Sequence, residues 1–200
     1  MLQRPIYRLL PEKMLILASE SPRRRELLGR LGVGFTVEPA RVEELEQGSD
    51  LSSLPEKNAL LKANAVAEKF PGNFVIGADT GVFCGGKMLG KPGEAEKAVE
   101  MLTMLSGTTH QVISGTALIC RSRNICRSWS SVSNVTFKKL TRDEIRCYTE
   151  QVYVLDKAGG YAIQERPELL GAVWEGELEN IIGLPLVKLA EVLGEYGLLP

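Results

Sequence analysis

The sequence predicts an α/β fold built on one mixed β-sheet with helices packed against it. Short apolar runs alternate with amphipathic segments over the first half of the chain, which is typical of strands joined by helices. Residues 109–138 then contain two long strand-like segments in succession, which indicates an antiparallel pair. We therefore expect a mixed central sheet flanked by helices.

The first half of the chain holds the alternating elements. Residues 14–19 form an apolar run typical of a buried strand, and Ser21 with Pro22 suit the N-cap and first position of a helix. Gly32 is expected to end that helix. The next elements are expected to be a strand at 35–38, a polar loop at 39–52, a helix at 54–70, a strand at 74–79 and a hairpin turning at Gly85-Gly86.

The second half combines long strands with further helices. Gly107 is expected to end one helix, and Thr141 to open another as its N-cap. The elements expected here are helices at 93–107 and 141–151, two strands joined near 121–124, a short strand after residue 164 and a closing helix from about residue 184.

Composition limits the classes of function. The 200 residues suffice for one well-buried domain or for two lobes that share a cleft. The net charge of -1 gives no global attraction to nucleic acid or to an anionic membrane, and no apolar run approaches the roughly 20 residues of a membrane span. We expect a cytoplasmic protein without a signal peptide, with a single domain at 14–200 after a peripheral extension at 1–13.

The cysteines and the single histidine argue against zinc and against a catalytic triad. None of the four cysteines forms a C-x-x-C pair, so reduced and mostly buried thiols are expected. His110 cannot complete a Cys/His zinc set, and without a G-x-S-x-G elbow no Ser-His-Asp triad is predicted. We favour a structural role for His110 over that of a general base, because the acidic residues suit metal–phosphate chemistry better. A P-loop is also missing, because no G-x-x-x-x-G-K-[ST] occurs.

The segment S-E-S-P-R-R-R at 19–25 indicates an anion site. The first turn of a helix has unpaired N–H groups and a partial positive charge, so three consecutive arginines there are unfavourable by about 0.3–1 kcal/mol each. A bound phosphate would reverse that effect. The alternative is that the arginines point into water or pair with Glu20 and Glu26.

Acidic and basic residues farther along the chain add candidates for the same site. Asp79, beside Thr80, follows an apolar strand and so lies where α/β sheets bind ligands, although it can also cap a turn. Lys91 between Gly90 and Pro92 suits phosphate, but both it and Lys62 can equally be solvated surface lysines.

The Gly-rich segment D-K-A-G-G-Y-A-I-Q at 156–164 indicates a ligand loop. Two glycines let a loop approach a ligand closely, Tyr161 can stack on a base, and Gln164 offers a donor and an acceptor for a base edge. The alternative is a structural turn with a buried tyrosine.

Taken in order, these pieces resemble the Maf family of nucleotide pyrophosphatases. One piece alone is a weak signal, but the set covers most of the chain from about residue 14 to 187. The pieces are LASESPRRRELL, VEE, LLKANAVA, VIGADTGV, LGKP, AVEMLTMLSGTTHQVISG, DKAGGYAIQ and IIGLPL.

The resemblance implies fold, chemistry and assembly. Family members have two lobes around a deep cleft and are related in architecture to the inosine-triphosphate pyrophosphatases. They cleave nucleoside triphosphates to the monophosphate and pyrophosphate with a divalent cation, Mg²⁺ or Mn²⁺, and are commonly homodimers. The same properties are therefore expected of this chain.

The resemblance also implies roles for individual residues. Asp79 matches the family's proposed general base. Glu44 and Asp79 match the positions that hold the metal. The phosphate-binding positions fall on Ser19, Arg23, Arg24, Lys62 and Lys91.

Substrate preference follows from three positions. Arg23, Thr80 and Gln164 match the branch that acts on dTTP and UTP, and the pattern of the 7-methyl-GTP branch is missing. The chain departs from the family at Tyr153-Val154-Leu155, where Glu-Pro is common, and at residues 165–168, which are usually Gly-rich. These departures lie next to Gln164 and bear on base preference more than on phosphate chemistry.

Other functions stay open at this point. A phosphotransferase would move phosphate to an acceptor other than water, and a nucleotide sensor would bind without turnover. A nucleic-acid-binding module is disfavoured, because the chain has no broad basic stripe.

Overall fold

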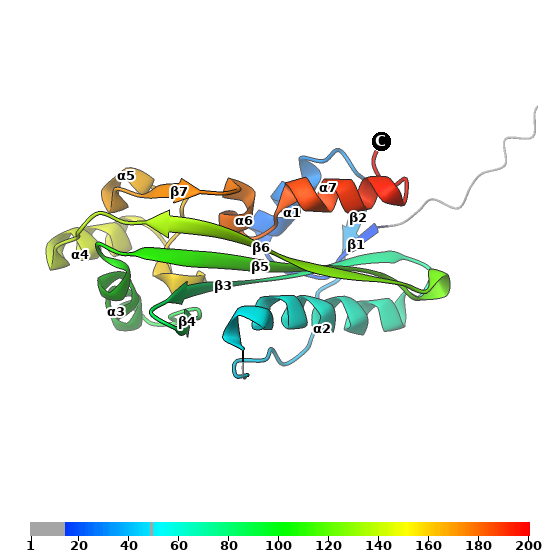
Figure 1. The fold of residues 1–200 in the computed structure, drawn as a ribbon, viewed down its shortest axis with the longest axis horizontal. Helices are drawn as coiled ribbons and strands as arrows, with labels where there is room; N and C mark the ends of the chain where they lie inside the picture. Colours follow the sequence, from blue (N-terminus) through cyan, green and yellow to red (C-terminus); the bar gives the residue numbers. More distant parts are fainter. Residues whose placement is uncertain (1–14, 49) are drawn as a thin grey trace, which may run out of the picture.

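The computed structural model describes residues 15–48 and 50–200, and it confirms the mixed α/β sheet flanked by helices (Figure 1). The expected extension at 1–13 and the possible strand residue Met14 lie outside the described residues. The strands are β1 (Leu15–Leu17), β2 (Phe35–Val37), β3 (Phe74–Cys84), β4 (Lys87–Leu89), β5 (Thr109–Cys120), β6 (Ile125–Thr136) and β7 (Val173–Glu175).

Helices connect and cover these strands. The α-helices are α1 (Pro22–Gly29), α2 (Leu54–Lys69), α3 (Ala95–Leu105), α4 (Arg142–Gln151), α5 (Pro167–Leu170), α6 (Leu178–Ile182) and α7 (Leu186–Glu195). Short 3-10 turns are η1 (Leu51–Ser53), η2 (Arg121–Arg123) and η3 (Ala158–Gly160). The sequence did not predict α5 and α6, because helices this short carry too few residues to show a period.

The sheet has the strand order β2-β1-β3-β5-β6-β7, with β4 paired to β3. The first three strands are parallel, and all later pairs are antiparallel. The expected hairpin at Gly85-Gly86 is present, because Cys84 pairs with Lys87 across that turn.

Helix boundaries follow local capping. The Ser21 hydroxyl accepts a hydrogen bond from the Arg24 backbone N–H, and Pro22 occupies the first turn as expected. Thr141 forms a capping box with Glu144, which fixes the start of α4. Helix α1 ends at Gly29 rather than at Gly32, whose positive φ closes the turn that follows.

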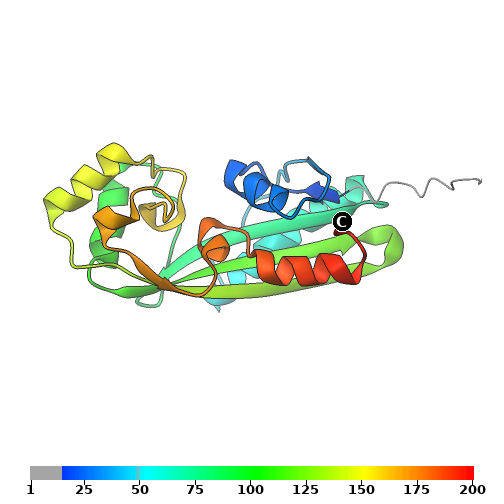
Figure 2. The same ribbon diagram turned by 90° about the horizontal axis from the view of Figure 1, so that it is seen from above.

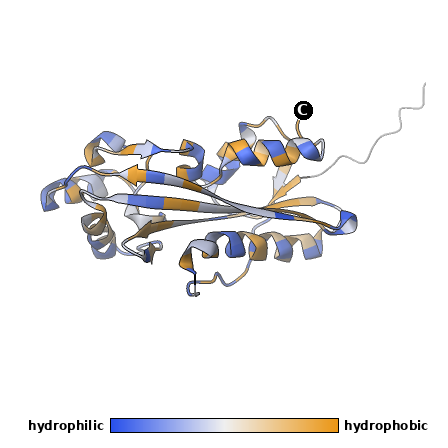
Figure 3. Ribbon diagram, viewed as in Figure 1, coloured by the Kyte–Doolittle hydropathy of each residue, from blue (hydrophilic) through white to orange (hydrophobic). Residues whose placement is uncertain are grey.

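Two lobes share the long strands β3, β5 and β6, which run from one to the other (Figure 2). In the first lobe, α2 covers one face of the sheet and α1 with α7 cover the opposite face (Figure 1). Helix α7 alternates hydrophobic and hydrophilic residues, as expected of a helix with one face on a sheet (Figure 3). The second lobe has its own core between the sheet, α3 and α4.

Two glycines bring α2 unusually close to the sheet. A Cβ at Gly77 of β3 would lie 2.1 Å from the Ala59 carbonyl oxygen, and one at Gly115 of β5 would lie 2.3 Å from the backbone of Pro55 and Glu56. The helix therefore packs on bare strand backbone. Its distance from the sheet is fixed by contacts that no side chain can adjust.

The cysteine prediction was partly wrong. All four cysteines are free, but Cys126 and Cys147 are exposed, and only Cys120 is fully buried. Cys126 lies on β6 at a position whose side chain faces solvent, and Cys147 lies on the outer face of α4. In the part of the chain that the structure describes, no helix has the length and apolar character needed to cross a membrane.

We predict that Gly77→Ala destabilises the protein by about 3 kcal/mol or more, because a methyl group would push α2 off the sheet. Gly72→Ala is the matched control, since its Cβ would meet nothing within 4 Å. Urea unfolding of both variants measures the difference. Equal midpoints for the two variants would contradict the close packing described for α2.

Candidate active site between the two lobes

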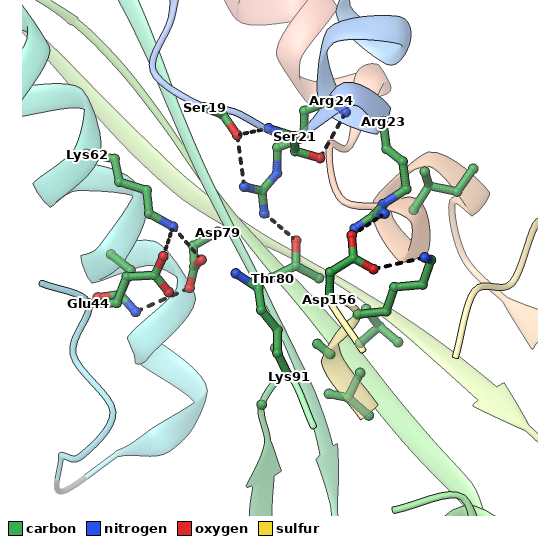
Figure 4. Close-up of a pocket in the computed structure, with 18 of the residues that line it drawn as sticks. Ser19, Ser21, Arg23, Arg24, Glu44, Lys62, Asp79, Thr80, Lys91 and Asp156 are labelled. Atoms are coloured by element: carbon green, nitrogen blue, oxygen red, sulfur yellow. Dashed lines mark hydrogen bonds and ion pairs between the residues drawn. The ribbon is translucent and has the colours of Figure 1, made fainter. Parts of the chain in front are cut away.

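All nine residues predicted to form the site line one cavity of about 1390 Å³ between the lobes. Figure 4 labels all of them except Gln164. This is larger than most small-molecule pockets, which span roughly 300–1,000 Å³. The first lobe contributes the α1 start, the 40–47 loop and α2, and the second lobe contributes residues 88–91 and 156–164. The nine residues are Ser19, Arg23, Arg24, Glu44, Lys62, Asp79, Thr80, Lys91 and Gln164.

The cavity opens on an uncovered edge of β3. Strand β1 pairs with β3 only as far as Ile76, and β4 begins to pair at Val82. Asp79 and Thr80 lie between these points. Asp79 was expected just past the end of a strand, but β3 continues to Cys84, so it is the neighbouring strand that ends. Asp79 therefore lies inside β3, at the edge that the neighbouring strand leaves uncovered.

Strand alternation sends Asp79 and Thr80 to opposite faces of the sheet. Residues 74, 76 and 78 of β3 pack on the α1 and α7 side, so Asp79 faces α2. One Asp79 carboxylate oxygen accepts a hydrogen bond from Lys62 Nζ at 2.7 Å, and the other accepts from Asn58 Nδ2 at 3.2 Å.

Lys62 joins two carboxylates. Its Nζ lies 2.7 Å from Asp79 Oδ1 and 2.7 Å from Glu44 Oε1, and the lysine is buried. Burial of Glu44 opposes its ionisation, but the hydrogen bond and charge of Lys62 outweigh this and hold its pKa below the ordinary value. Lys62 is thus an internal partner of two acids rather than a surface lysine.

The two carboxylates form a donor set that fits Mg²⁺ or Mn²⁺. Magnesium is usually held by one or two carboxylates together with substrate phosphates and water. Glu44 and Asp79 supply such a pair on one cavity wall. No group of three or more His, Cys, Asp or Glu side chains suited to a metal occurs among the described residues. A cation held by this pair would take its remaining ligands from a substrate or from water.

Arg24 is held as a fork that faces the cavity. Its Nε donates to the Gly183 carbonyl at 2.9 Å, Nη1 to Ser19 Oγ at 3.3 Å and Nη2 to Thr80 Oγ1 at 3.1 Å. A guanidinium has five N–H donors, so one on each terminal nitrogen is left for a ligand. Burial lowers the Arg24 pKa, while the charge of Asp79 raises it.

The Thr80 hydroxyl continues this network into the protein. Thr80 Oγ1 lies 2.9 Å from Ser114 Oγ, which donates to the Asn180 carbonyl at 2.9 Å. Ser114 and Asn180 are fully buried. The side chain of Thr80 thus anchors the Arg24 fork to β5 and α6 through hydrogen bonds.

Arg23 and Asp156 bridge the two lobes at the cavity. Arg23 Nη1 lies 3.4 Å from Asp156 Oδ2, and both side chains are partly exposed (Figure 4). Arg23 and Arg24 pair with neither Glu20 nor Glu26, which was the alternative drawn from the sequence; Glu26 pairs with Arg30 instead. Lys91 and Gln164 are exposed, line the cavity and form no ion pair or hydrogen bond within the described residues.

The Gly-rich loop packs on protein rather than on open space. A Cβ at Gly159 would meet the Val82 side chain at 3.0 Å, and one at Gly160 would meet the Ala98 backbone at 3.3 Å. Tyr161 is buried, and its hydroxyl lies 2.9 Å from His110 Nε2. The glycines therefore serve close packing of the loop, and the Tyr161 ring is edge-on to His110 and Phe137.

Sequence reasoning passed over three residues of this site. Asn58 lies four residues before Lys62, a spacing that puts both on one helix face, and this signal was available. Asp156 stands in the Gly-rich motif and was given no role. Ser114 lies in a long strand with nothing local to distinguish it.

Comparison with known proteins decides the family. A model described as Maf-like protein matches residues 14–196. The chain belongs to the Maf family. A Moorella thermoacetica relative named dTTP/UTP pyrophosphatase is 46% identical over 92% of this chain and 95% of its own. A relative of the same name from Akkermansia muciniphila is 44% identical and covers 91% of this chain and 96% of the relative's own length. One from Myxococcus xanthus is 42% identical and covers 94% of this chain and 94% of the relative's own length.

A solved structure shares the fold of this Maf protein. The Staphylococcus aureus Ham1 protein superposes with a TM-score of 0.54 at 18% identity, covering 92% of this chain and 100% of its own. The likeness supports the expected two-lobed architecture. At this identity it carries no conclusion on chemistry.

We predict that His110→Gln flattens the dependence of stability on pH. Burial lowers the His110 pKa from 6.5 to about 4, so between these values the unfolded chain binds a proton that the folded protein does not. This contribution is complete above pH 6.5 and is lost as the pH falls toward 4. The variant should lose roughly 3 kcal/mol less over this range in urea unfolding; parallel profiles for the two proteins would contradict the prediction.

Proposed function

We propose that this Maf protein hydrolyses nucleoside triphosphates to the monophosphate and pyrophosphate, with dTTP and UTP as preferred substrates. One observation carries the proposal: an acid with unused lone pairs and an arginine fork with unused N–H groups line the same cavity. The names of relatives more than 40% identical to the chain support the same activity and substrates.

Asp79 is proposed as the general base. Each of its carboxylate oxygens accepts one hydrogen bond, and a carboxylate has about four lone-pair sites, which leaves room for water. Asp79 takes a proton from that water as its oxygen attacks the α phosphorus. The bond from the α phosphorus to the bridging oxygen breaks, and pyrophosphate leaves with the electron pair. A positioned base contributes about 10²–10⁴-fold to such a step.

Cationic side chains are proposed to bind the phosphate groups. Arg24 presents its two free N–H groups as a fork, Ser19 lies beside it, and Lys91 extends from the opposite lobe (Figure 4). Lys62 contacts the Asp79 and Glu44 carboxylates from behind and offsets their negative charge. Groups fixed before the substrate arrives stabilise charge that develops in the transition state.

The charge balance of the cavity supports dependence on a divalent cation. Six acids among the described residues line it, namely Glu20, Glu43, Glu44, Glu46, Asp79 and Asp156. Five bases line it, namely Arg23, Arg24, Lys62, Lys91 and Lys157. These nearly cancel, so the protein alone does not neutralise a triphosphate. We propose that Glu44 and Asp79 hold Mg²⁺ or Mn²⁺, which when bound supplies positive charge to the phosphate oxygens.

The nucleobase of the substrate is proposed to occupy the end of the cavity that the second lobe forms. Ile163 and Ile181 give this end an apolar wall, and Gln164 next to it offers a donor and an acceptor. Arg23 lies across from Gln164's loop, where it pairs with Asp156. A homodimer, which the family resemblance implies, and a cytoplasmic location, which the composition favours, belong to the same proposal.

A panel of nucleoside triphosphates with Mg²⁺ or Mn²⁺ tests the function. We expect dTTP and UTP to yield monophosphate and pyrophosphate at rates above those of purine nucleotides. Release of orthophosphate in place of pyrophosphate would indicate transfer of the terminal phosphate instead. Tight binding without turnover would identify a nucleotide sensor and end the proposal.

We predict that Asp79→Asn lowers kcat for dTTP by about 10²-fold or more, because an amide cannot accept the proton of the attacking water. The variant should stay folded, since an amide occupies the same volume. Circular dichroism and urea unfolding establish folding, and a pyrophosphate assay measures turnover. Wild-type turnover in a folded Asp79→Asn protein removes Asp79 from the mechanism.

We predict that Thr80→Val lowers kcat/KM for dTTP and UTP alike by about tenfold or more. The loss of a hydrogen bond to a charged donor is worth about 1.5–3 kcal/mol, and Arg24 Nη2 loses its acceptor. Thr80→Ser keeps the hydroxyl and should retain most activity. A loss for dTTP and UTP that purine nucleotides do not share would instead assign Thr80 to contact with the nucleobase.

A further inference from the structure

The loop that carries Glu44 has no regular structure of its own. Residues 38–48 form neither helix nor strand, and most of them are exposed. In the described part of the chain, residues 39–48 are tied to the rest of the protein by packing of Ala40 on the core beneath α2, by hydrogen bonds at Leu45 and by the Glu44–Lys62 ion pair. A loop held so sparsely needs a specific contact to place a carboxylate.

Asn58 of α2 provides that contact. Its Oδ1 accepts a hydrogen bond from the Leu45 backbone N–H at 2.7 Å, and its Nδ2 donates to the Leu45 carbonyl at 3.1 Å. The amide thus pairs with the Leu45 backbone as a neighbouring strand would. Glu44, one residue earlier, is thereby held against Lys62.

The same side chain also reaches Asp79. Nδ2 donates to Asp79 Oδ2 at 3.2 Å, so both acceptors of this amide nitrogen belong to the site or to its loop. Asn58 is only 3% exposed, so these contacts are shielded from competing water. With Oδ1 bonded as well, every polar atom of the side chain is in use.

The position of Asn58 follows from the packing of α2. Asn58 and Lys62 are four residues apart and share one face of the helix. The close approach at Gly77 sets that face against β3. Asn58 and Lys62 therefore each reach one oxygen of the same carboxylate.

We propose that Asn58 is a positioning residue that joins Glu44 and Asp79 into one preorganised carboxylate pair. It clamps the Glu44 loop through Leu45 and orients Asp79 through its second N–H group. The proposed role of the pair rests on the function proposed above, but the clamp itself is a property of the protein without ligand.

The clamp is tested by amide hydrogen exchange in ¹⁵N-labelled full-length protein. We expect the Leu45 N–H to exchange at least tenfold faster in Asn58→Ala than in wild type, while the α2 amides after residue 60 keep their protection. Asn58→Asp retains the acceptor for the Leu45 N–H and should keep part of its protection. Unchanged exchange at Leu45 in Asn58→Ala overturns the proposal.

The carboxylate pair is tested by Mn²⁺ binding and by turnover. We expect Asn58→Ala to weaken binding of Mn²⁺, measured with pyrophosphate present, by about tenfold or more, because partners that orient ligands are typically worth 10–100-fold. Asn58→Asp should lose dTTP turnover as well, since it cannot donate to Asp79 and adds a negative charge beside it. Wild-type Mn²⁺ affinity in a folded Asn58→Ala protein contradicts the inference.

Asn64→Ala is the matched control. Asn64 lies on the same helix but accepts a hydrogen bond from the exposed Arg121 and does not line the cavity. It should match wild type in exchange at Leu45, Mn²⁺ affinity and turnover. If wild type itself turns over no nucleotide, the proposed function fails while the exchange result still decides the clamp.

Discussion

The contact of α2 with bare sheet backbone is the constraint on which the site depends. At Gly77 and Gly115 no side chain stands between helix and strand, so the helix axis cannot shift without a backbone clash. Asn58 and Lys62 are therefore fixed in position together with α2, and both donate hydrogen bonds to the Asp79 carboxylate. Catalytic geometry has to be held within about half an ångström, and packed backbone achieves this better than a flexible side chain does.

The alternation of a β-strand then divides the site in two. Asp79 faces α2 and accepts hydrogen bonds from Asn58 and Lys62, whereas Thr80 faces the other side and accepts one from Arg24. Both remain accessible because β1 stops short and leaves this edge of β3 uncovered. Asp79 thus places a carboxylate on one face of the strand, and Thr80 holds the Arg24 cation on the other. The cavity lies across the strand edge between these two groups.

Much of this was predictable from the sequence, for reasons that differ between elements. Strong local signals predicted the start of α1 at Ser21 and Pro22 and the hairpin at Gly85-Gly86, because caps and turns depend on adjacent residues. Ordered motifs predicted which residues share the cavity.

Long-range contacts were not predictable in the same way. The burial of Lys62 between two acids depends on how far α2 lies from β3, and a helical pattern alone favours a solvent-facing lysine. Asn58 was missed because it bonds to the backbone of a loop, and that loop has no hydrophobic periodicity from which its position could be predicted. The exposed Cys126 and Cys147 show the limit of composition, since a residue's average burial says nothing about which face of its element it occupies.

The ammonium group of Lys62 also explains how the Glu44 and Asp79 carboxylates can lie close together in the protein without ligand. Without a shared cation, Glu44 and Asp79 would repel each other. Lys62 Nζ lies 2.7 Å from a carboxylate oxygen of each and offsets that repulsion. A metal ion alone must compete with this ammonium, whereas one that arrives with a triphosphate also gains the phosphate oxygens. The arrangement therefore favours a cation bound together with substrate, and it disfavours a permanently resident one.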